Sequence, residues 1–479
     1  MAPRNILLLH CHDLGRFLGC YGVTTVRTPA LDTFAADAAL FERAFAVAPH
    51  CSPARSALFT GTYPQRNGVL GLTHSPFDWD LADPATHVGN RLRGAGYRTE
   101  LIGVHHESRV LADEVVAARL GFDRVCTDTD RDTVVANAVG AIARSRDDDR
   151  PFYLQVGFHE PHRTASESDP VGVMGFLAPG VVPDDRAGTT VPPYLRDDEG
   201  ARIEIAELQG AVGALDDGVA RILTELDASG LADSTIVVFT TDHGLALPGA
   251  KCTLYDAGLE VALMIRVPGR PGWGGTRVSG LASHIDILPT LFELIGIPGE
   301  EFSGTSLVAA VESSAPTETQ IFGQLSFHTY YDPKRSIRTD GHKLIANFSA
   351  SPRAMDPTQS WNHRSTPAVL QGRSTGASQP LELYDLVADP LERHDLSRDP
   401  GAAFELGVLA AALLGWMEQQ QDPLLVPSAV DPRHDLSLAL LRQAAAAQYG
   451  SGRTGAPPYD HPATTRTVPA GTSREQDNS

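Results

Sequence analysis

The sequence predicts an α/β fold with a large, mostly parallel sheet flanked by helices, and three apolar runs are the main reason. These runs read as buried strands and cover residues 4–10, 152–158 and 235–240. A stretch with helical spacing of its apolar residues, 201–230, lies between the last two runs. Strands that alternate with helices favour a parallel sheet, and such sheets bind ligands beyond the carboxyl ends of their strands.

Ionisable residues follow each apolar run, where the predicted strand ends. His12 and Asp13 follow the first run, the segment 159–162 follows the second, and Asp242 and His243 follow the third. Because the carboxyl ends of parallel strands meet at one edge of a sheet, we expect these side chains to converge.

Composition and charge restrict the class of protein. A chain of 479 residues with 42% hydrophobic and 20% charged residues is typical of a soluble globular protein with two domains. The formal net charge of −20 argues against nucleic acid as a partner, because phosphate binding needs a concentrated basic surface. An anionic substrate would need a site that is locally cationic or loaded with a metal.

The cysteines and the N-terminus bear on the compartment. The five cysteines are odd in number and scattered, which does not indicate a disulfide framework or a zinc site. Residues 6–9 are too short an apolar run for a signal sequence, and we expect no membrane-spanning segment and no membrane partner. A cytoplasmic location is therefore expected, with secretion as the alternative.

Pattern changes along the chain suggest its domains. We predict a catalytic domain over 1–315 and a smaller domain over 316–449. Short strand-like pieces at 320–323, 336–339 and 343–345 predict a small antiparallel sheet, and residues 402–419 predict a helix. The segment 450–479 is rich in Thr, Pro, Gly and Ser, which predicts a disordered tail.

The run Cys51-Ser52-Pro53-Ala54-Arg55, with Thr60-Gly61 after it, is the most specific motif in the chain. It resembles the signature of the type I sulfatase family, in which the cysteine is oxidised to formylglycine. The resemblance implies an alkaline-phosphatase-like fold and a formylglycine-generating enzyme as partner in maturation. It also implies a helix that begins at the modified residue, with Arg55 one turn along and on the same side. Segments 67–74 and 158–163 look most like the N-sulfoglucosamine sulfohydrolase branch.

The same resemblance implies a divalent metal, Ca²⁺ in most of the family. Asp13, Asp242 and His243 match the ligand pattern, beside the modified Cys51. His12 stands where the family usually has Asp. Since imidazole suits softer transition metals better than calcium, the sequence leaves the identity of the metal open.

Further residues match the family's proton carriers and sulfate-binding cations. His162, in a Pro-His pair, and His106 match the histidines that act on the leaving group, and Lys251 matches a lysine that contacts the sulfate. Val104 replaces a second lysine that the family has beside His106. We also predict a substrate rim, for which surface or domain-interface positions are the alternative. Its members are His74, His328, Asp332 and Arg335.

These observations predict a sulfatase that hydrolyses a sulfate ester or N-sulfamate of a sulfated sugar. A phosphonate or phosphodiester hydrolase with the same nucleophile is one alternative. A non-catalytic sugar-binding homologue is the other, suggested by His12 and Val104. The sequence makes no prediction of the oligomeric state.

Overall fold

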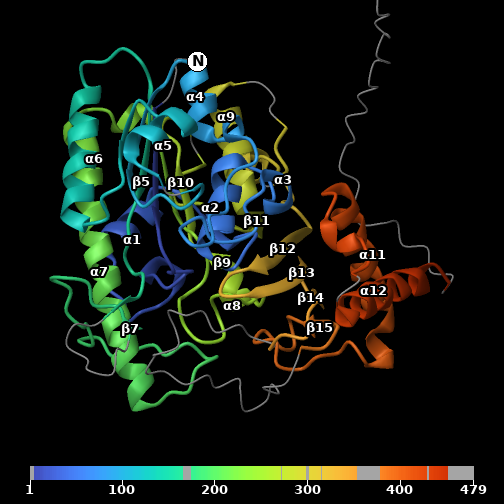
Figure 1. The fold of residues 1–479 in the computed structure, drawn as a ribbon. Helices are drawn as coiled ribbons and strands as arrows, with labels where there is room; N and C mark the ends of the chain where they lie inside the picture. Colours follow the sequence, from blue (N-terminus) through green and yellow to red (C-terminus); the bar gives the residue numbers. More distant parts are fainter. Residues whose placement is uncertain are drawn as a thin grey trace, which may run out of the picture.

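The computed structural model describes residues 5–109, 111–165, 174–270, 272–297, 301–313, 315–352, 378–428 and 431–450. Two sheets of different size dominate it (Figure 1). The predicted disordered tail, 450–479, lies outside the described residues from 451 onward.

The large sheet has nine strands, and most neighbours run parallel. Its order is β11-β2-β10-β8-β1-β5-β3-β4, with β9 paired to β2. The strands are β1 (Asn5–Cys11), β2 (Ala39–Phe45), β3 (Arg98–Gly103), β4 (Arg124–Cys126), β5 (Phe152–Gly157), β8 (Thr235–Thr241), β9 (Glu260–Val261), β10 (Leu263–Arg266) and β11 (Arg277–Ser283). Strands β9 and β10 pair antiparallel with their neighbours. The predicted mostly parallel sheet is confirmed.

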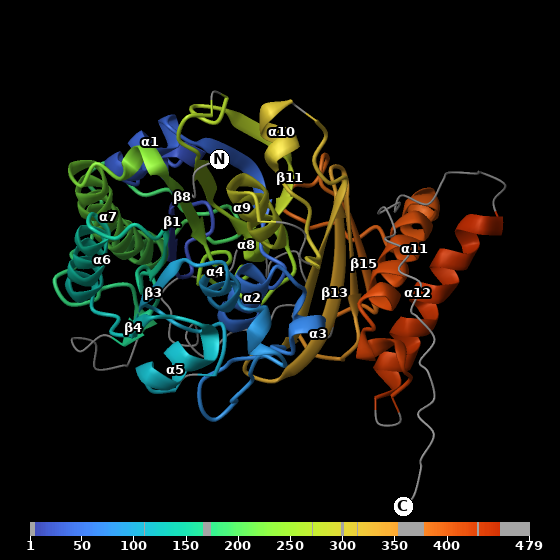
Figure 2. The same ribbon diagram turned by 90° about the horizontal axis from the view of Figure 1, so that it is seen from above.

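Helices cover both faces of this sheet because its central strands are apolar on both sides. Leu7 and Leu9 of β1 join one hydrophobic core, and Ile6 and Leu8 join the other. The first core is covered by α1 (Pro29–Ala36), α6 (Arg131–Ser145) and α7 (Glu199–Ala228), which lie together in Figure 2. The second is covered by α2 (Cys51–Thr60), α4 (Val88–Gly94), α5 (Asp113–Leu120), α9 (Ile287–Ile295) and α10 (Val308–Glu312).

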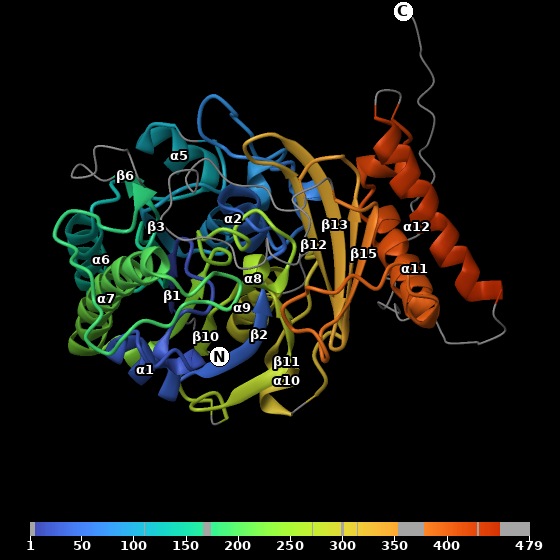
Figure 3. The same cartoon turned by 90° about the horizontal axis from the view of Figure 1, so that it is seen from below.

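The small sheet is antiparallel, as predicted, and follows chain order. It consists of β12 (Gln320–Phe327), β13 (Tyr331–Thr339), β14 (His342–Asn347) and β15 (Leu381–Asp385). One face packs on the large domain through a core that includes Phe45 and Ile345. The other face is covered by α11 (Ala403–Gln419) and α12 (Pro432–Gly450), as Figure 3 shows. Both faces are therefore buried. The predicted boundary at 315 precedes this sheet and stays a prediction.

Helix α11 differs from one expectation. The segment Pro400–Gln419 is long and apolar enough to cross a membrane by length and composition alone, although we expected no such segment. Its apolar residues pack on the small sheet and α12: Leu409, Leu413, Trp416 and Met417 are buried there. These residues form the packed side of the helix, and 39% of its apolar window is buried.

The remaining α-helices and strands of the described chain are short. They are α3 (Pro64–Asn67), α8 (Asp256–Leu259) and the two-stranded sheet of β6 (Thr164–Ala165) and β7 (Met174–Gly175), and short 3-10 helices such as Gly19–Tyr21 also occur.

The register of the central strands positions the polar segments. His10 of β1 lies opposite Gly157 of β5 and Thr240 of β8, and Gly103 of β3 lies opposite Gly157. The chain therefore leaves all four strands at one edge of the sheet. The segments that follow these strands meet there, as the sequence predicted.

Candidate active site

Cys51 is the first residue of α2, with His50 as the helix N-cap in an extended conformation. All ten residues of α2 are buried, and Cys51 is 3% exposed. Gly61 ends the helix in the left-handed conformation at φ 66°, which glycine adopts without strain. The predicted helix that begins at the signature cysteine is present.

Arg55 lies one turn along α2 from Cys51, but its guanidinium is occupied by the protein. It is fully buried, and Nη2 donates to the carbonyl of Cys11 at 3.0 Å and to Oδ2 of Asp242 at 3.2 Å. Nη1 donates to Nδ1 of His10. Arg55 therefore fixes the ends of β1 and β8 relative to α2.

Two aspartates form the floor of the site. The backbone N–H of Asp13 donates to Oδ1 of Asp242 at 2.8 Å, which joins the ends of β1 and β8. Asp13 has φ 52°, in the left-handed region that a non-glycine residue rarely adopts and that concentrates at functional sites. This conformation turns the chain sharply after β1.

His243 and Lys251 stand between these acids and Cys51. Nδ1 of His243 donates to the carbonyl of Gly244 at 2.9 Å, which turns Nε2 toward Oδ1 of Asp13, 3.0 Å away. Nζ of Lys251 donates to both oxygens of Asp13, at 2.8 and 3.0 Å. The Sγ atom of Cys51 lies 3.6 Å from Nε2 of His243 and 3.6 Å from Nζ of Lys251. Residue 51 thus points at a paired acid and two potential cations.

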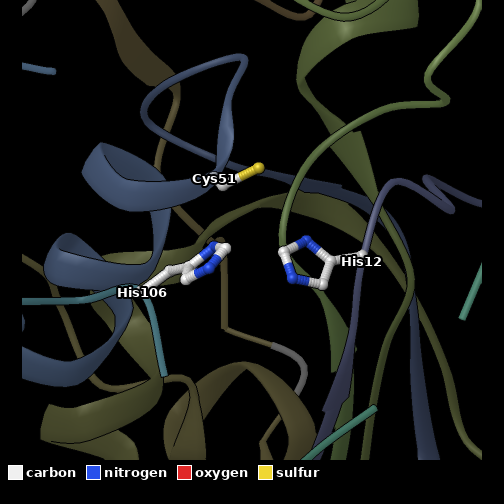
Figure 4. Close-up of side chains that lie close together, drawn as sticks. All are labelled: His12, Cys51 and His106. Atoms are coloured by element: carbon white, nitrogen blue, oxygen red, sulfur yellow. The ribbon is translucent and has the colours of Figure 1, made fainter. Parts of the chain in front are cut away.

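His12 lies beside this group with its polar atoms unused. It is fully buried, and Nδ1 lies 3.1 Å from Oδ2 of Asp242, yet neither ring nitrogen makes a hydrogen bond among the described residues. Figure 4 shows the rings of His12 and His106 facing each other below the sulfur of Cys51.

A cluster of imidazoles surrounds His12. The ring centroid of His12 lies 5.2 Å from that of His106 and 4.9 Å from that of His162. His159, which the sequence analysis did not select, lies 5.7 Å from His12 and 4.7 Å from His162. Its place in the polar segment after β5 was the available signal.

Neighbouring charges keep Asp13 and Asp242 ionised. Burial alone would raise the pKa values of Asp13 and Asp242, but Lys251 beside the first and His243 and Arg55 beside the second hold both well below the usual range. Burial would lower the pKa of His243, but Asp242 and Asp13 raise it to about 10. Both acids are therefore ionised.

The other imidazoles respond to burial in the opposite direction. Burial, followed by Arg55, lowers the pKa of His12 well below the usual value. Burial also lowers the pKa of His162 to about 4. His12 and His162 are neutral at pH 7, and neutral imidazole is the form that binds a metal.

The donor set fits a divalent cation. One ligand atom from each of His12, Asp13, Cys51 and Asp242 falls within 4.8 Å of the others. The orphaned nitrogens of His12 and the two ionised carboxylates supply the donors for such an ion.

Val104 follows β3 and is buried, and its N–H donates to the carbonyl of Gly157 at 2.9 Å. His105 beside it is also buried, with Nε2 hydrogen-bonded to the hydroxyl of Ser108 at 3.1 Å. The side chain of His105 therefore has a structural partner of its own.

The predicted substrate rim is only partly brought to the site. His328 is buried against His50, with ring centroids 5.4 Å apart, and His50 precedes Cys51, a second residue that the sequence analysis did not select. His74 is half-buried, with its ring centroid 6.1 Å from that of His106. These histidines flank the site on two sides.

Arg335 and Asp332 were predicted on the rim, and the structure places both in buried ion pairs. Nε of Arg335 lies 2.5 Å from Oδ2 of Asp422, and its Nη1 donates to the carbonyl of Leu325 at 2.9 Å. Oδ2 of Asp332 lies 2.7 Å from Nζ of Lys334. The guanidinium of Arg335 is thus buried and held within the small domain, and its place on the substrate rim stays a prediction.

Comparison with known proteins identifies the family. The family model described as Sulfatase matches residues 4–297. The chain belongs to the sulfatase family. Its members are sulfuric ester hydrolases, and this is the enzyme class of the protein.

Individual relatives support this membership. A human protein named N-sulphoglucosamine sulphohydrolase is 30% identical over 469 residues, which cover 88% of this chain and 91% of that protein. A solved structure described as a complex with its substrate D-glucosamine-2-N,6-O-disulfate has a TM-score of 0.65 at 17% identity, covering 88% of this chain and 99% of that one. The phosphonate monoester hydrolase of Agrobacterium radiobacter has a TM-score of 0.59 at 20% identity, covering 87% and 95%. The two structures show that this sulfatase has the alkaline-phosphatase-like fold that the motif implied.

Proposed function

We propose that the protein hydrolyses a sulfate ester or N-sulfamate of a sulfated sugar, with Cys51 converted to formylglycine by a formylglycine-generating enzyme. The position of the Cys51 side chain carries the proposal. Its Sγ atom lies 3.6 Å from both Lys251 and His243, over the ionised Asp13 and Asp242. A nucleophile at this position faces two cationic side chains in a protein whose net charge is −20.

Formylglycine at position 51 would supply a hydrated aldehyde. One hydroxyl would bond to sulfur as the sugar oxygen or nitrogen leaves with a proton, and loss of the proton of the other hydroxyl would re-form the carbonyl and release sulfate. Asp13, Asp242 and His12, with His243 once it gives up its proton, would hold a divalent cation, which would supply positive charge against the sulfate oxygens. The other groups that act at the site are side chains of this protein.

Lys251 and Arg55 take different parts in this reaction. Nζ of Lys251 reaches Cys51 Sγ and is cationic, because burial would lower its pKa but Asp13 and Cys51 raise it well above the usual value. It can stabilise negative charge at residue 51 and on the sulfate. Arg55 was predicted to be catalytic, but its contacts with Asp242, Cys11 and His10 support a positioning part instead.

His106 and His162 are the candidates for protonating the leaving group. Both rings lie about the His12 ring, and Nδ1 of His106 has no hydrogen-bond partner among the described residues. Nδ1 of His162 donates to the carbonyl of Arg163 at 2.7 Å, which leaves Nε2 for the site. A leaving sugar oxygen or nitrogen needs a proton, and a positioned imidazole can carry it.

The substrate class rests on the relatives. The human relative's name refers to N-sulphoglucosamine, and one similar structure contains a sulfated glucosamine. We therefore propose a sulfated amino sugar as the first substrate to test.

A substrate panel tests the proposal. The protein is produced together with a formylglycine-generating enzyme, loaded with a divalent metal, and given N-sulfoglucosamine, glucosamine 6-O-sulfate, an aryl sulfate and an aryl phosphonate monoester. Sulfate release from a sulfated sugar, absent in Cys51→Ala, supports the proposal. Turnover of the phosphonate alone would replace it with the phosphonate hydrolase alternative. Sugar binding without turnover, by protein carrying formylglycine, would favour the non-catalytic alternative.

A further inference from the structure

His12 is one of the residues that would hold the divalent cation, and no described protein group hydrogen-bonds to its ring. Both its ring nitrogens are buried and unpaired among the described residues, while Nδ1 faces Asp242 at 3.1 Å. A buried imidazole with two unsatisfied nitrogens is costly unless something else contacts it. A metal ion at the centre would satisfy one of them.

The oxygen donors at this centre are few and partly occupied. Lys251 donates to both oxygens of Asp13, and Arg55 donates to Oδ2 of Asp242. Calcium takes six to eight oxygen ligands at about 2.3–2.6 Å, and two carboxylates engaged in this way supply only part of that set.

Nitrogen donors are plentiful by comparison, and residue 51 as formylglycine would offer oxygen in place of sulfur. His12 belongs to two sets of possible ligands: one with Asp13, Cys51 and Asp242, the other with Cys51 and His106. His243 directs Nε2 to the same acids, because its Nδ1 is held by the carbonyl of Gly244. A hydrogen bond on the far nitrogen is the usual support of a metal-binding histidine.

We propose that His12 is a metal ligand that shifts this centre away from calcium and toward a first-row transition metal ion. This inference rests on the divalent site of the proposed function. Imidazole suits ions such as Zn²⁺, whereas Asp at this position would suit Ca²⁺. One side chain therefore changes the class of metal that the same fold binds.

A competition experiment tests the selectivity. Metal-free protein is equilibrated with Zn²⁺ and Ca²⁺ together, desalted, and its metal content measured by mass spectrometry. The same measurement is made on His12→Asp and on the control His394→Asp, which makes the same exchange at a side chain that is 80% exposed. We expect the zinc-to-calcium ratio to fall by about tenfold or more in His12→Asp and to stay unchanged in the control. An equal ratio in wild type and a folded His12→Asp would overturn the proposal.

A spectroscopic measurement identifies the ligand directly. In protein loaded with Cu²⁺, pulsed electron paramagnetic resonance detects the remote nitrogen of each coordinated imidazole. We expect one imidazole fewer in His12→Gln than in wild type. If His12→Asp does not fold, wild-type protein that retains calcium in preference to zinc would overturn the proposal.

These results are separable from the proposed reaction. A transition-metal preference in a protein that releases no sulfate would support the inference on His12 and contradict the proposed function. A preference for calcium in an active sulfatase would contradict the inference on His12 and support the proposed function.

Discussion

Lys251 holds both carboxylate oxygens of Asp13, at 2.8 and 3.0 Å, while the same ammonium lies 3.6 Å from the sulfur of Cys51. Both side chains are fully buried. The pair therefore links the nucleophile to the floor of the site, and its two charges compensate each other away from water.

Replacing Lys251 by Met should affect both stability and catalysis. It leaves Asp13 buried with one cation fewer, which costs about 3–5 kcal/mol in metal-free protein. KM for a sulfated substrate should rise as well, because a cation beside the sulfate is lost. Urea unfolding and steady-state kinetics measure the two effects.

The double variant Asp13→Asn with Lys251→Met is the matched control for the stability effect. It removes both charges together, so its loss of stability should be smaller than the sum of the single losses. Additive losses would show that the two groups are not coupled.

Cys51→Ala should abolish turnover, with a fall in kcat of about 10³-fold or more, because no other described side chain is positioned as the nucleophile. Cys126→Ala, at a half-buried cysteine on β4, is the control and should retain activity. Peptide mass spectrometry of wild-type protein measures the conversion of Cys51. Full activity of protein with an unmodified thiol would contradict the proposed chemistry.

Exchange of His162 for Gln should matter most for substrates with poor leaving groups. We expect kcat for a sugar sulfate to fall about 10²–10⁴-fold, and kcat for an activated aryl sulfate to fall much less, because an aryl leaving group needs little protonation. Comparing the two substrates in His162→Gln and His106→Gln identifies the proton donor. If a variant loses kcat equally on both substrates, the replaced residue is not the proton donor.

Arg335→Met should lower stability and leave KM unchanged. The guanidinium is buried in a pair with Asp422, so its removal leaves that carboxylate uncompensated, at a cost of about 3–5 kcal/mol. His328→Gln, at the end of the site nearer His50, is the comparison and should change KM more than stability. A raised KM in folded Arg335→Met would support its predicted place on the substrate rim.

The buried carboxyl group of Asp286 should make the stability of the protein depend on pH. Burial raises the pKa of Asp286 to about 7. Hydrogen bonds from the backbone N–H groups of Thr305 and Ser283 lower this pKa, but by less than burial raises it. Between about pH 4 and 7 the folded protein keeps a proton that the unfolded chain has lost, so stability falls as pH rises through this window. Each unit of pKa difference corresponds to about 1.4 kcal/mol.

Asp286→Asn should remove this part of the pH dependence, and Asp233→Asn, at an exposed residue, should not. Thermal unfolding at several pH values between 4 and 8 measures the slope. The same slope in Asp286→Asn and wild type would show that another group is responsible.

The sequence predicted the centre of the site because strand ends and the Cys51 motif are local features. Runs such as 235–240 end where the sheet ends, so Asp242 and His243 could be placed before the fold was known. The contact of Lys251 with Asp13 could not, because the loop after β8 has no periodicity that fixes its path.

The small domain shows why the rim was harder to predict. Polar side chains on a strand normally face water, which favoured an exposed position for Arg335. In β13 both faces are covered, by α11 and α12 on one side and by the large domain on the other. A buried charged residue needs an oppositely charged or hydrogen-bonding partner, and Arg335 forms an ion pair with Asp422.

The burial of Cys51 has a consequence for the order of events during synthesis. A modifying enzyme, as proposed, would have to reach Cys51 before the domain folds, since all of α2 is buried in the folded domain. Asp242 lies 191 positions further along the chain (242 minus 51), so the strand that closes the site emerges much later from the ribosome. At about 5–20 residues per second this delay is roughly 10–40 s. If Cys51 is modified as proposed, the rate of elongation therefore limits the time in which the modifying enzyme can reach it before the domain folds.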